Sequence, residues 1–359
     1  MAIYFVILFV LAFSLCFKSH TKYVFVFLLF LLAVIGASRS ITVGTDNEIY
    51  CLNFNSTTAN TDSWSEYTEF EPGFNYLIVF FKTYISKDYY VFMSFLYIVW
   101  IIAYYKYVKF FRVGYLLPLF IGYCLCFITT PYNIMRQSFA LSLYSFILPL
   151  LMGTKRERFF YLVLCLTIGM LFHRSLVVLS LLVFLFHDCV LNLFYKKKII
   201  ITILIISFFA NFLSSYLLSF LSDYMFFFQL LGDRYAGYIR NASLDDERGS
   251  RLSAMLETFM SCVAVSSLNK KDRFYTLYVM FICLYLVLQN VLGSIFVIFM
   301  RIAYNFQWIW IFVYTTILKD RSKKYCCWID RLIILYCLVI FIKAILKNFG
   351  DIVPYVVRF

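Results

Sequence analysis

The sequence predicts an all-α, polytopic membrane protein, and three observations carry this prediction. Hydrophobic residues make up 63% of the 359 residues, and aromatic residues 22%. The mean hydropathy is +0.84, which is far above that of a soluble domain. Apolar runs of about 15–22 residues recur from one end of the chain to the other. Because lipid offers the backbone no hydrogen bonds, these runs must be helical.

Twelve of the runs are predicted to cross the membrane, and charged or polar connectors separate them. A further run, residues 73–86, is short and is interrupted by Lys82. We expect a re-entrant or interfacial helix there, on the outer face of the membrane. The twelve expected spans, in chain order, are residues 3–17, 23–37, 89–105, 113–129, 136–152, 158–172, 174–190, 199–221, 252–268, 274–291, 302–318 and 331–348.

The basic connectors predict the orientation. The positive-inside rule places all six of them in the cytoplasm: residues 18–22, 106–112, 155–158, 196–198, 270–273 and 319–331. They alternate with the other loops only if the twelve runs cross and residues 73–86 do not. Both termini are then outside, as are two long polar loops, residues 38–72 and 222–251. We expect residues 1–359 to form a single transmembrane domain.

Arginine is enriched on the predicted outer side. Thirteen lysines and six arginines lie inside in this topology, whereas four lysines and nine arginines lie outside. Topology requires only positive charge, but phosphate recognition favours the planar guanidinium, which binds two oxygens at once. We interpret Arg136, Arg174 and Arg301 as functional, because they stand at span ends where charge is costly. Arg248 and Arg358 have the simpler interpretation of headgroup or carboxylate partners, as does Arg251.

Composition also excludes several functions. The net charge of +13 comes largely from predicted cytoplasmic lysines, so it reports orientation and does not predict a nucleic-acid partner. Most of the eleven cysteines lie within spans, and no Cys/His spacing suggests zinc. Residues 245–247 are acidic but follow no metal-ligand spacing. We therefore expect no metal and no cofactor.

The outer loops have the composition of a glycan site. Tyr and Trp stand beside carboxylates and amides in residues 38–72 and 222–251, as in many surfaces that stack on sugar rings. Aromatic belts also mark membrane interfaces, so this pattern alone is weak. Together with the outer arginines, it predicts a sugar joined to a phosphate, as in a lipid-linked oligosaccharide.

Several segments resemble one known family, and they follow one another in its order. Arg39, then Gly44-Thr45-Asp46, Tyr50 and Glu71-Pro72-Gly73-Phe74 resemble the amino-terminal signature of the EpsG family, the Wzy-like polymerases of bacterial exopolysaccharide, capsule and O-antigen. Asn133-Ile134-Met135-Arg136-Gln137 resembles its N-x-x-R-Q segment, and Phe172-His173-Arg174-Ser175 its F-H-x-S turn. Position 174 is variable in the family pattern, so Arg174 matches less firmly than Arg136. Further matches are Arg234, Tyr235, Tyr238, Arg301 and Tyr304.

The resemblance implies a glycosyltransferase of the membrane-embedded, GT-C-like class in the bacterial cytoplasmic membrane. It would transfer the growing glycan from undecaprenyl diphosphate to the non-reducing end of another lipid-linked repeat unit, on the periplasmic or outer face. A chain-length regulator and a flippase are the implied protein partners. The leaving group is a diphosphate, which guanidinium groups could stabilise, and a carboxylate or His could accept the proton of the attacking hydroxyl.

Candidate residues follow from these roles. The catalytic candidates are Arg136, Arg301, Asp46, Glu71 and His173. The substrate-binding candidates are Arg39, Asn133, Gln137, Arg174, Arg234, Tyr235, Tyr238, Arg240 and Tyr304. Several have an ordinary interpretation as well: His173 as a helix-end hydrogen-bonding residue, and Asp46 and Glu71 as salt-bridge partners of the arginines.

Two other functions stay open. A flippase or exporter of the same lipid would have a similar number of spans, but it would carry charges and broken helices near the bilayer midplane. In this sequence the polar residues concentrate toward one face, and only 12 Gly and 5 Pro occur in the chain. An outer-leaflet glycan ligase would share the arginines, and only the local signatures argue against it.

Overall fold

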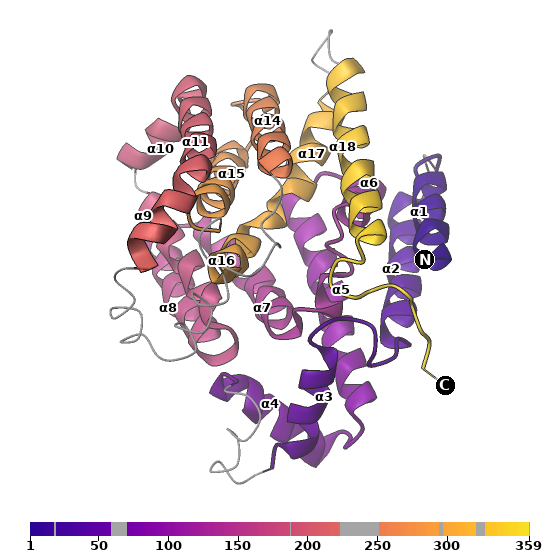
Figure 1. Ribbon diagram of the computed structural model, residues 1–359. Coiled ribbons are helices and arrows are strands. Elements are labelled where there is room, and N and C mark those ends of the chain that lie inside the picture. The colour runs from indigo at the N-terminus through magenta and orange to yellow at the C-terminus, as the bar shows by residue number, and fades with distance from the viewer. Residues whose placement is uncertain are drawn as a thin grey trace. The chain divides into compact units, whose positions relative to one another are not determined.

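The computed structural model is all-helical, which confirms the all-α part of the predicted fold class for the residues that it describes (Figure 1). These are residues 1–17, 19–58, 70–186, 188–222, 251–293, 297–320 and 327–358. Within these ranges there is no strand, and the only bridge is an isolated one between Arg39 and Val357. The chain divides into two compact units, one of Met1–Val183 with Asp330–Phe359 and the other of Phe184–Ile329.

The first unit contains most of the family-like motifs named above, so its helices matter most for the site. In chain order they are α1 (Ala2–Ser14), α2 (Thr21–Ala37), α3 (Asn47–Ser56), α4 (Pro72–Tyr84), α5 (Tyr89–Phe111), α6 (Leu116–Cys124), α7 (Met135–Leu151), α8 (Lys155–Phe172) and most of α18 (Cys327–Leu346). A 3₁₀ turn, Thr130–Tyr132, leads into α7, and a 3₁₀ helix, Arg174–Leu181, follows α8.

The second unit is built from α10 (Asp188–Phe194), α11 (Lys197–Ser222), α14 (Arg251–Ser267), α15 (Tyr275–Val287), α16 (Val297–Gln307) and α17 (Ile309–Lys319). A π-helical turn, Leu288–Gly293, continues α15. The buried Asn290 side chain donates from Nδ2 to the hydroxyls of Ser207 on α11 and Thr258 on α14, at 3.1 and 3.2 Å. These bonds tie the π-helical turn to two neighbouring helices.

Most predicted spans correspond to one helix, but three do not. Residues 113–129 contain only the nine-residue α6, which is followed by turns. Residues 174–190 form the 3₁₀ helix, then α9 (Leu182–Leu185) and the start of α10. A side chain of α8 also bonds to the 3₁₀ helix: the Tyr161 hydroxyl donates to the carbonyl oxygen of Leu179 at 2.7 Å. Residues 302–318 are divided between α16 and α17 at Trp308, whose indole N–H donates to the Asn305 carbonyl at 2.8 Å.

Length and composition single out α5 as long and apolar enough to cross a membrane, among the helices in the described ranges. Shorter apolar helices include α1, α2 and α15. Together with the family assignment below, the all-helical fold indicates a membrane protein, and the number of twelve spans stays a prediction.

An aromatic core fixes the end of the first unit that carries the motifs. Phe54 of α3, Phe74 of α4, Phe92 of α5 and Phe139 of α7 are buried in one hydrophobic cluster. The Phe54 and Phe92 rings stack with centroids 5.0 Å apart, and Phe74 meets both Phe92 and Phe139 edge to face. This packing holds the beginnings of α4 and α7 side by side, and the polar motif residues lie at those beginnings.

Candidate active site

The carboxylate of Glu71 is the centre of the candidate site. Glu71 immediately precedes α4, and Pro72 occupies the first helical position, where its missing N–H has no cost. The Glu71 side chain makes no capping bond to its own helix. It is instead turned toward α7 and the end of α8, and only 8% of it is exposed.

Gly73 allows α4 to approach α8 closely. A Cβ atom at this position would lie 2.7 Å from both the Cβ and the carbonyl oxygen of Leu171. Real contacts of that length do not occur, so a larger residue would push α4 away from the end of α8. The glycine of the E-P-G-F segment therefore brings Glu71 within reach of His173 and Arg174.

Arg136 forms an ion pair with Glu71. It is the second residue of α7, and its Nη1 donates to Glu71 Oε2. The guanidinium also lies over the Phe70 ring, with Cζ 4.0 Å from the ring centroid, and 6.0 Å from that of Tyr50. Its side chain is 11% exposed, and Nε is buried without a hydrogen-bond partner among the described residues. The pair and the two rings hold the guanidinium in one orientation.

The F-H-x-S turn supplies the remaining contacts of Glu71. His173 Nδ1 lies 3.5 Å from Glu71 Oε1, and the backbone N–H of Arg174 donates to the same oxygen at 3.3 Å. His173 is 13% exposed, whereas the Arg174 side chain is exposed to solvent. Position 174 thus contributes a backbone donor to the site, which most residue types could supply.

These surroundings keep Glu71 ionised. Burial by itself raises the pKa of Glu71, but the hydrogen bond with His173, the charge of Arg136 and, when the imidazole is protonated, the charge of His173 outweigh it and lower the pKa to about 2. Glu71 is therefore a carboxylate throughout the physiological range. A carboxylate of such low pKa is a weak base, and it is well suited to orient a neighbouring imidazole.

A second group of predicted residues lies beside this centre. Asp46 immediately precedes α3, and its backbone N–H donates to Asn133 Oδ1 at 3.2 Å. Asn133 comes just before α7, three residues from Arg136. The side chain of Gln137 is almost fully buried in α7. The structure therefore joins the G-T-D and N-x-x-R-Q segments through the Asn133 carboxamide.

Arg39 lies inside the protein. It is 0% exposed, and its Nη1 donates to the carbonyl of Gly36 at 2.6 Å, close to the end of α2. Its guanidinium is 4.6 Å from the ring centroid of Tyr132 and 5.6 Å from that of Tyr97. Its visible role is to pack the segment after α2 against the turn that precedes α7. Contact with a substrate stays a prediction for this residue.

The remaining candidates belong to the second unit. Arg301 and Tyr304 are three residues apart in α16, a spacing that puts them on one face of the helix, and both are partly exposed. Arg234, Tyr235, Tyr238 and Arg240 lie outside the described residues. Within the described ranges, no group of three His, Cys, Asp or Glu side chains could hold a metal ion.

Two contributors were not predicted from the sequence. Phe70 places its ring against Arg136, and Lys82 donates to three carbonyls at the end of α3, those of Phe54, Asn55 and Thr57, at 2.9, 3.1 and 2.8 Å. Nothing in the sequence around Lys82 predicts that it caps α3. For Phe70, the available signal was its position directly before Glu71.

The chain belongs to the EpsG family, whose sequence pattern matches residues 22–357. This is a Wzy-like family of polysaccharide polymerases, so the resemblance predicted from the sequence is confirmed over nearly the whole chain. Polysaccharide polymerisation, a glycosyl-transfer activity, is therefore its general function. Comparisons with curated proteins and with solved structures give no significant match.

Proposed function

We propose that this protein polymerises lipid-linked oligosaccharide repeat units. The growing glycan would be transferred from undecaprenyl diphosphate to the non-reducing end of another undecaprenyl-diphosphate-linked unit. One observation carries the proposal beyond the family assignment. Segments that are 65 and 103 residues apart along the chain from Glu71 bring a guanidinium, an imidazole and a backbone N–H to its single carboxylate.

His173 is the proposed base. Glu71, with its pKa of about 2, is too weak a base to deprotonate a sugar hydroxyl, but it can accept a bond from Nδ1–H of His173. The Nε2 atom of that tautomer carries a lone pair and can take the proton as the hydroxyl attacks the anomeric carbon. This division of labour resembles that of carboxylate–histidine pairs in other enzymes, where the carboxylate orients the ring.

Arg136 is the proposed contact for the leaving diphosphate. A guanidinium carries five N–H donors, and the bond to Glu71 uses one of them. Stabilising charge that develops on a leaving group is the larger part of catalysis in such transfers, since the donor carbon is already activated. Arg301, Tyr304 and residues 234–240 stay proposed substrate contacts.

We further propose that twelve spans cross the bacterial cytoplasmic membrane and that the site faces the periplasm or the cell exterior. The alternating basic connectors support this topology. Single cysteines at positions 60 and 245, labelled with a membrane-impermeant reagent in intact cells, test it. Both should react from outside; reaction from opposite sides would contradict the topology. The flippase and the chain-length regulator stay proposed partners.

Purified protein in detergent provides the direct test of the reaction. Given undecaprenyl-diphosphate-linked repeat units without ATP or nucleotide sugar, it should lengthen the glycan. His173→Gln should reduce the rate by roughly a hundredfold or more, since general-base catalysis contributes about that much. His20→Gln is the matched control, because His20 is exposed in the turn before α2 and should be neutral.

The same assay separates the alternatives. A flippase would bind the lipid but form no glycosidic bond in detergent, where there is no membrane to cross. A ligase would form product only after a second kind of acceptor is added. Repeat units left unlengthened by folded protein with matched substrate would therefore refute the polymerase proposal.

A further inference from the structure

The chain's C-terminal tail, residues 348–358, runs along the segment that follows α2 (Figure 1). Near its end, the Ser40 N–H donates to the Val356 carbonyl and the Arg358 N–H to the Ser38 carbonyl, both at 2.8 Å. Nearer to α18, the N–H groups of Gly44 and Thr45 donate to the carbonyls of residues 351 and 350, at 3.0 and 3.1 Å. The tail is thus paired with the Arg39–Asp46 motif at two separate places.

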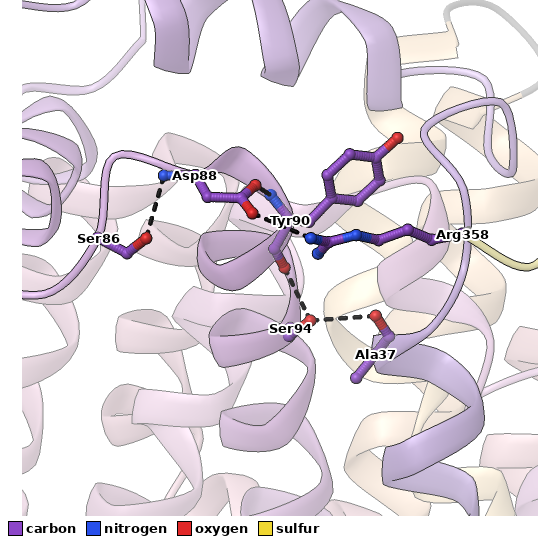
Figure 2. Close-up of polar contacts among 6 residues, drawn as sticks. All are labelled: Ala37, Ser86, Asp88, Tyr90, Ser94 and Arg358. Atoms are coloured by element: carbon purple, nitrogen blue, oxygen red, sulfur yellow. Dashed lines mark hydrogen bonds and ion pairs between the residues drawn. The ribbon is translucent and has the colours of Figure 1, made fainter.

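Side chains anchor the tail as well. The Tyr4 hydroxyl of α1 donates to the Ile352 carbonyl at 2.6 Å. Figure 2 shows the outer anchor, where Arg358 Nη2 lies 3.1 Å from Asp88 Oδ2 and the guanidinium lies over the Tyr90 ring, 4.3 Å from its centroid. Nearby, the Ser94 hydroxyl donates to the Ala37 carbonyl at 3.1 Å and joins α5 to the end of α2.

The inner part of the tail reaches the candidate site through Asn133. Gly350 has a φ of +75°, a conformation that favours glycine, and a Cβ there would lie 3.0 Å from Asn133 Nδ2. On its other side, Asn133 Oδ1 accepts the Asp46 N–H at 3.2 Å. The carboxamide therefore lies between the tail and the G-T-D segment. One residue separates Asn133 from the start of α7, which carries Arg136.

We propose that the C-terminal tail is a positioning element of the candidate site, and that it acts through Asn133 to set the place of Arg136. Asn133 is then a positioning residue and does not itself bind the glycan. The activity readout of this proposal rests on the proposed function, but its structural readouts do not. Because Arg136 lies in the first turn of α7, a shift of that turn moves the guanidinium relative to Glu71, and small misplacements reduce rates strongly.

Cross-linking tests the contact directly. The Cβ positions of residues 133 and 350 are 3.6 Å apart, within the range that a disulfide spans. Asn133→Cys/Gly350→Cys in a cysteine-free background should oxidise readily to an intramolecular disulfide, seen by mass spectrometry of the joined peptides. Failure to form this bond in folded protein would overturn the placement of the tail.

A double-mutant cycle tests the route through Asn133. Gly350→Ala and Asn133→Ala should each lower kcat by roughly tenfold with little change in KM, and the double variant should be no slower than either single one. Independent effects would multiply to roughly a hundredfold and would overturn the proposed route. Gly114→Ala is the matched control, because Gly114 has a similar φ of +88° in the turn between α5 and α6.

A readout without substrate separates this proposal from the proposed function. Phenylglyoxal modifies accessible arginines, and Arg136 is only 11% exposed. Modification of Arg136, followed by peptide mass spectrometry, should be several-fold faster in Gly350→Ala and unchanged in Gly114→Ala. Equal rates in the two variants would overturn the tail proposal even if wild-type protein polymerises. A faster rate in Gly350→Ala with no polymerisation by wild type would support the tail proposal and refute the function.

Discussion

Glu71→Gln is the sharpest test of the candidate site, because it removes one charge and keeps the shape of the side chain. Lowering the pKa of Glu71 from its ordinary 4.5 to about 2 corresponds to about 3 kcal/mol in favour of the ionised, folded state. The substitution also leaves the buried Arg136 guanidinium without its partner, for which losses of about 3–5 kcal/mol are typical. We therefore expect destabilisation by about 3 kcal/mol.

The pH dependence of stability gives the same prediction a second measurement. Because the folded-state pKa of Glu71 is depressed, its contribution is fully present above pH 4.5 and is lost as the pH falls toward 2. Thermal unfolding in detergent, followed between pH 7 and pH 3, should show wild type losing stability below about pH 4.5. The Glu71→Gln variant should lack this component, so the two curves should converge in acid.

Glu48→Gln is the matched control, since Glu48 is an exposed glutamate in the first turn of α3. We expect it to melt like wild type at pH 7, while Glu71→Gln melts on the order of 5 °C lower. Equal melting of the two variants, or curves for wild type and Glu71→Gln that stay parallel down to pH 3, would refute the account of Glu71 as a buried, paired carboxylate.

Three further predictions follow from single contacts. Arg136→Lys should slow elongation on the order of a hundredfold, nearly as much as Arg136→Ala, because lysine lacks the planar donor geometry; full activity of the lysine variant at normal protein level would show that charge suffices. Lys82→Met should destabilise the protein by about 1–2 kcal/mol in denaturation experiments, since the three carbonyls at the end of α3 lose their donor, and the exposed Lys87→Met should not. Arg174→Pro should reduce elongation much more than Arg174→Ala, because only proline removes the N–H that Glu71 accepts; equal rates would exclude a role for that bond.

Hydrophobic patterning predicted the helices of the first unit closely wherever a run was long and uniform. The expected spans 136–152 and 158–172 correspond to α7, Met135–Leu151, and α8, Lys155–Phe172. In contrast, α3 was not predicted, because Asn47–Ser56 is short and mixes polar with apolar residues. Contacts with other segments stabilise it: its own Phe54 packs into the aromatic core, and Lys82 of α4 donates to a carbonyl at its end.

The candidate site was predicted as a list of residue types and not as an arrangement. Short signatures named Glu71, Arg136 and His173, but no local rule places residues that are 65 or 103 positions apart on one carboxylate. Sequence patterns also predict roles for side chains and not for the backbone. They therefore gave Arg174 a guanidinium role, whereas the structure shows its backbone N–H at the site.

The burial of the Arg136–Glu71 pair itself favours a functional origin. Removing two charges from water costs several kcal/mol for each ion, and a buried pair is often no more stable than well-packed apolar residues of the same volume. The Phe70, Phe74 and Phe139 rings nearby show that the sequence has apolar packing at hand. A guanidinium fixed beside an imidazole is instead useful when a diphosphate must depart while a hydroxyl loses its proton. Glu71 can serve both groups at once, since one oxygen holds Arg136 and the other faces His173.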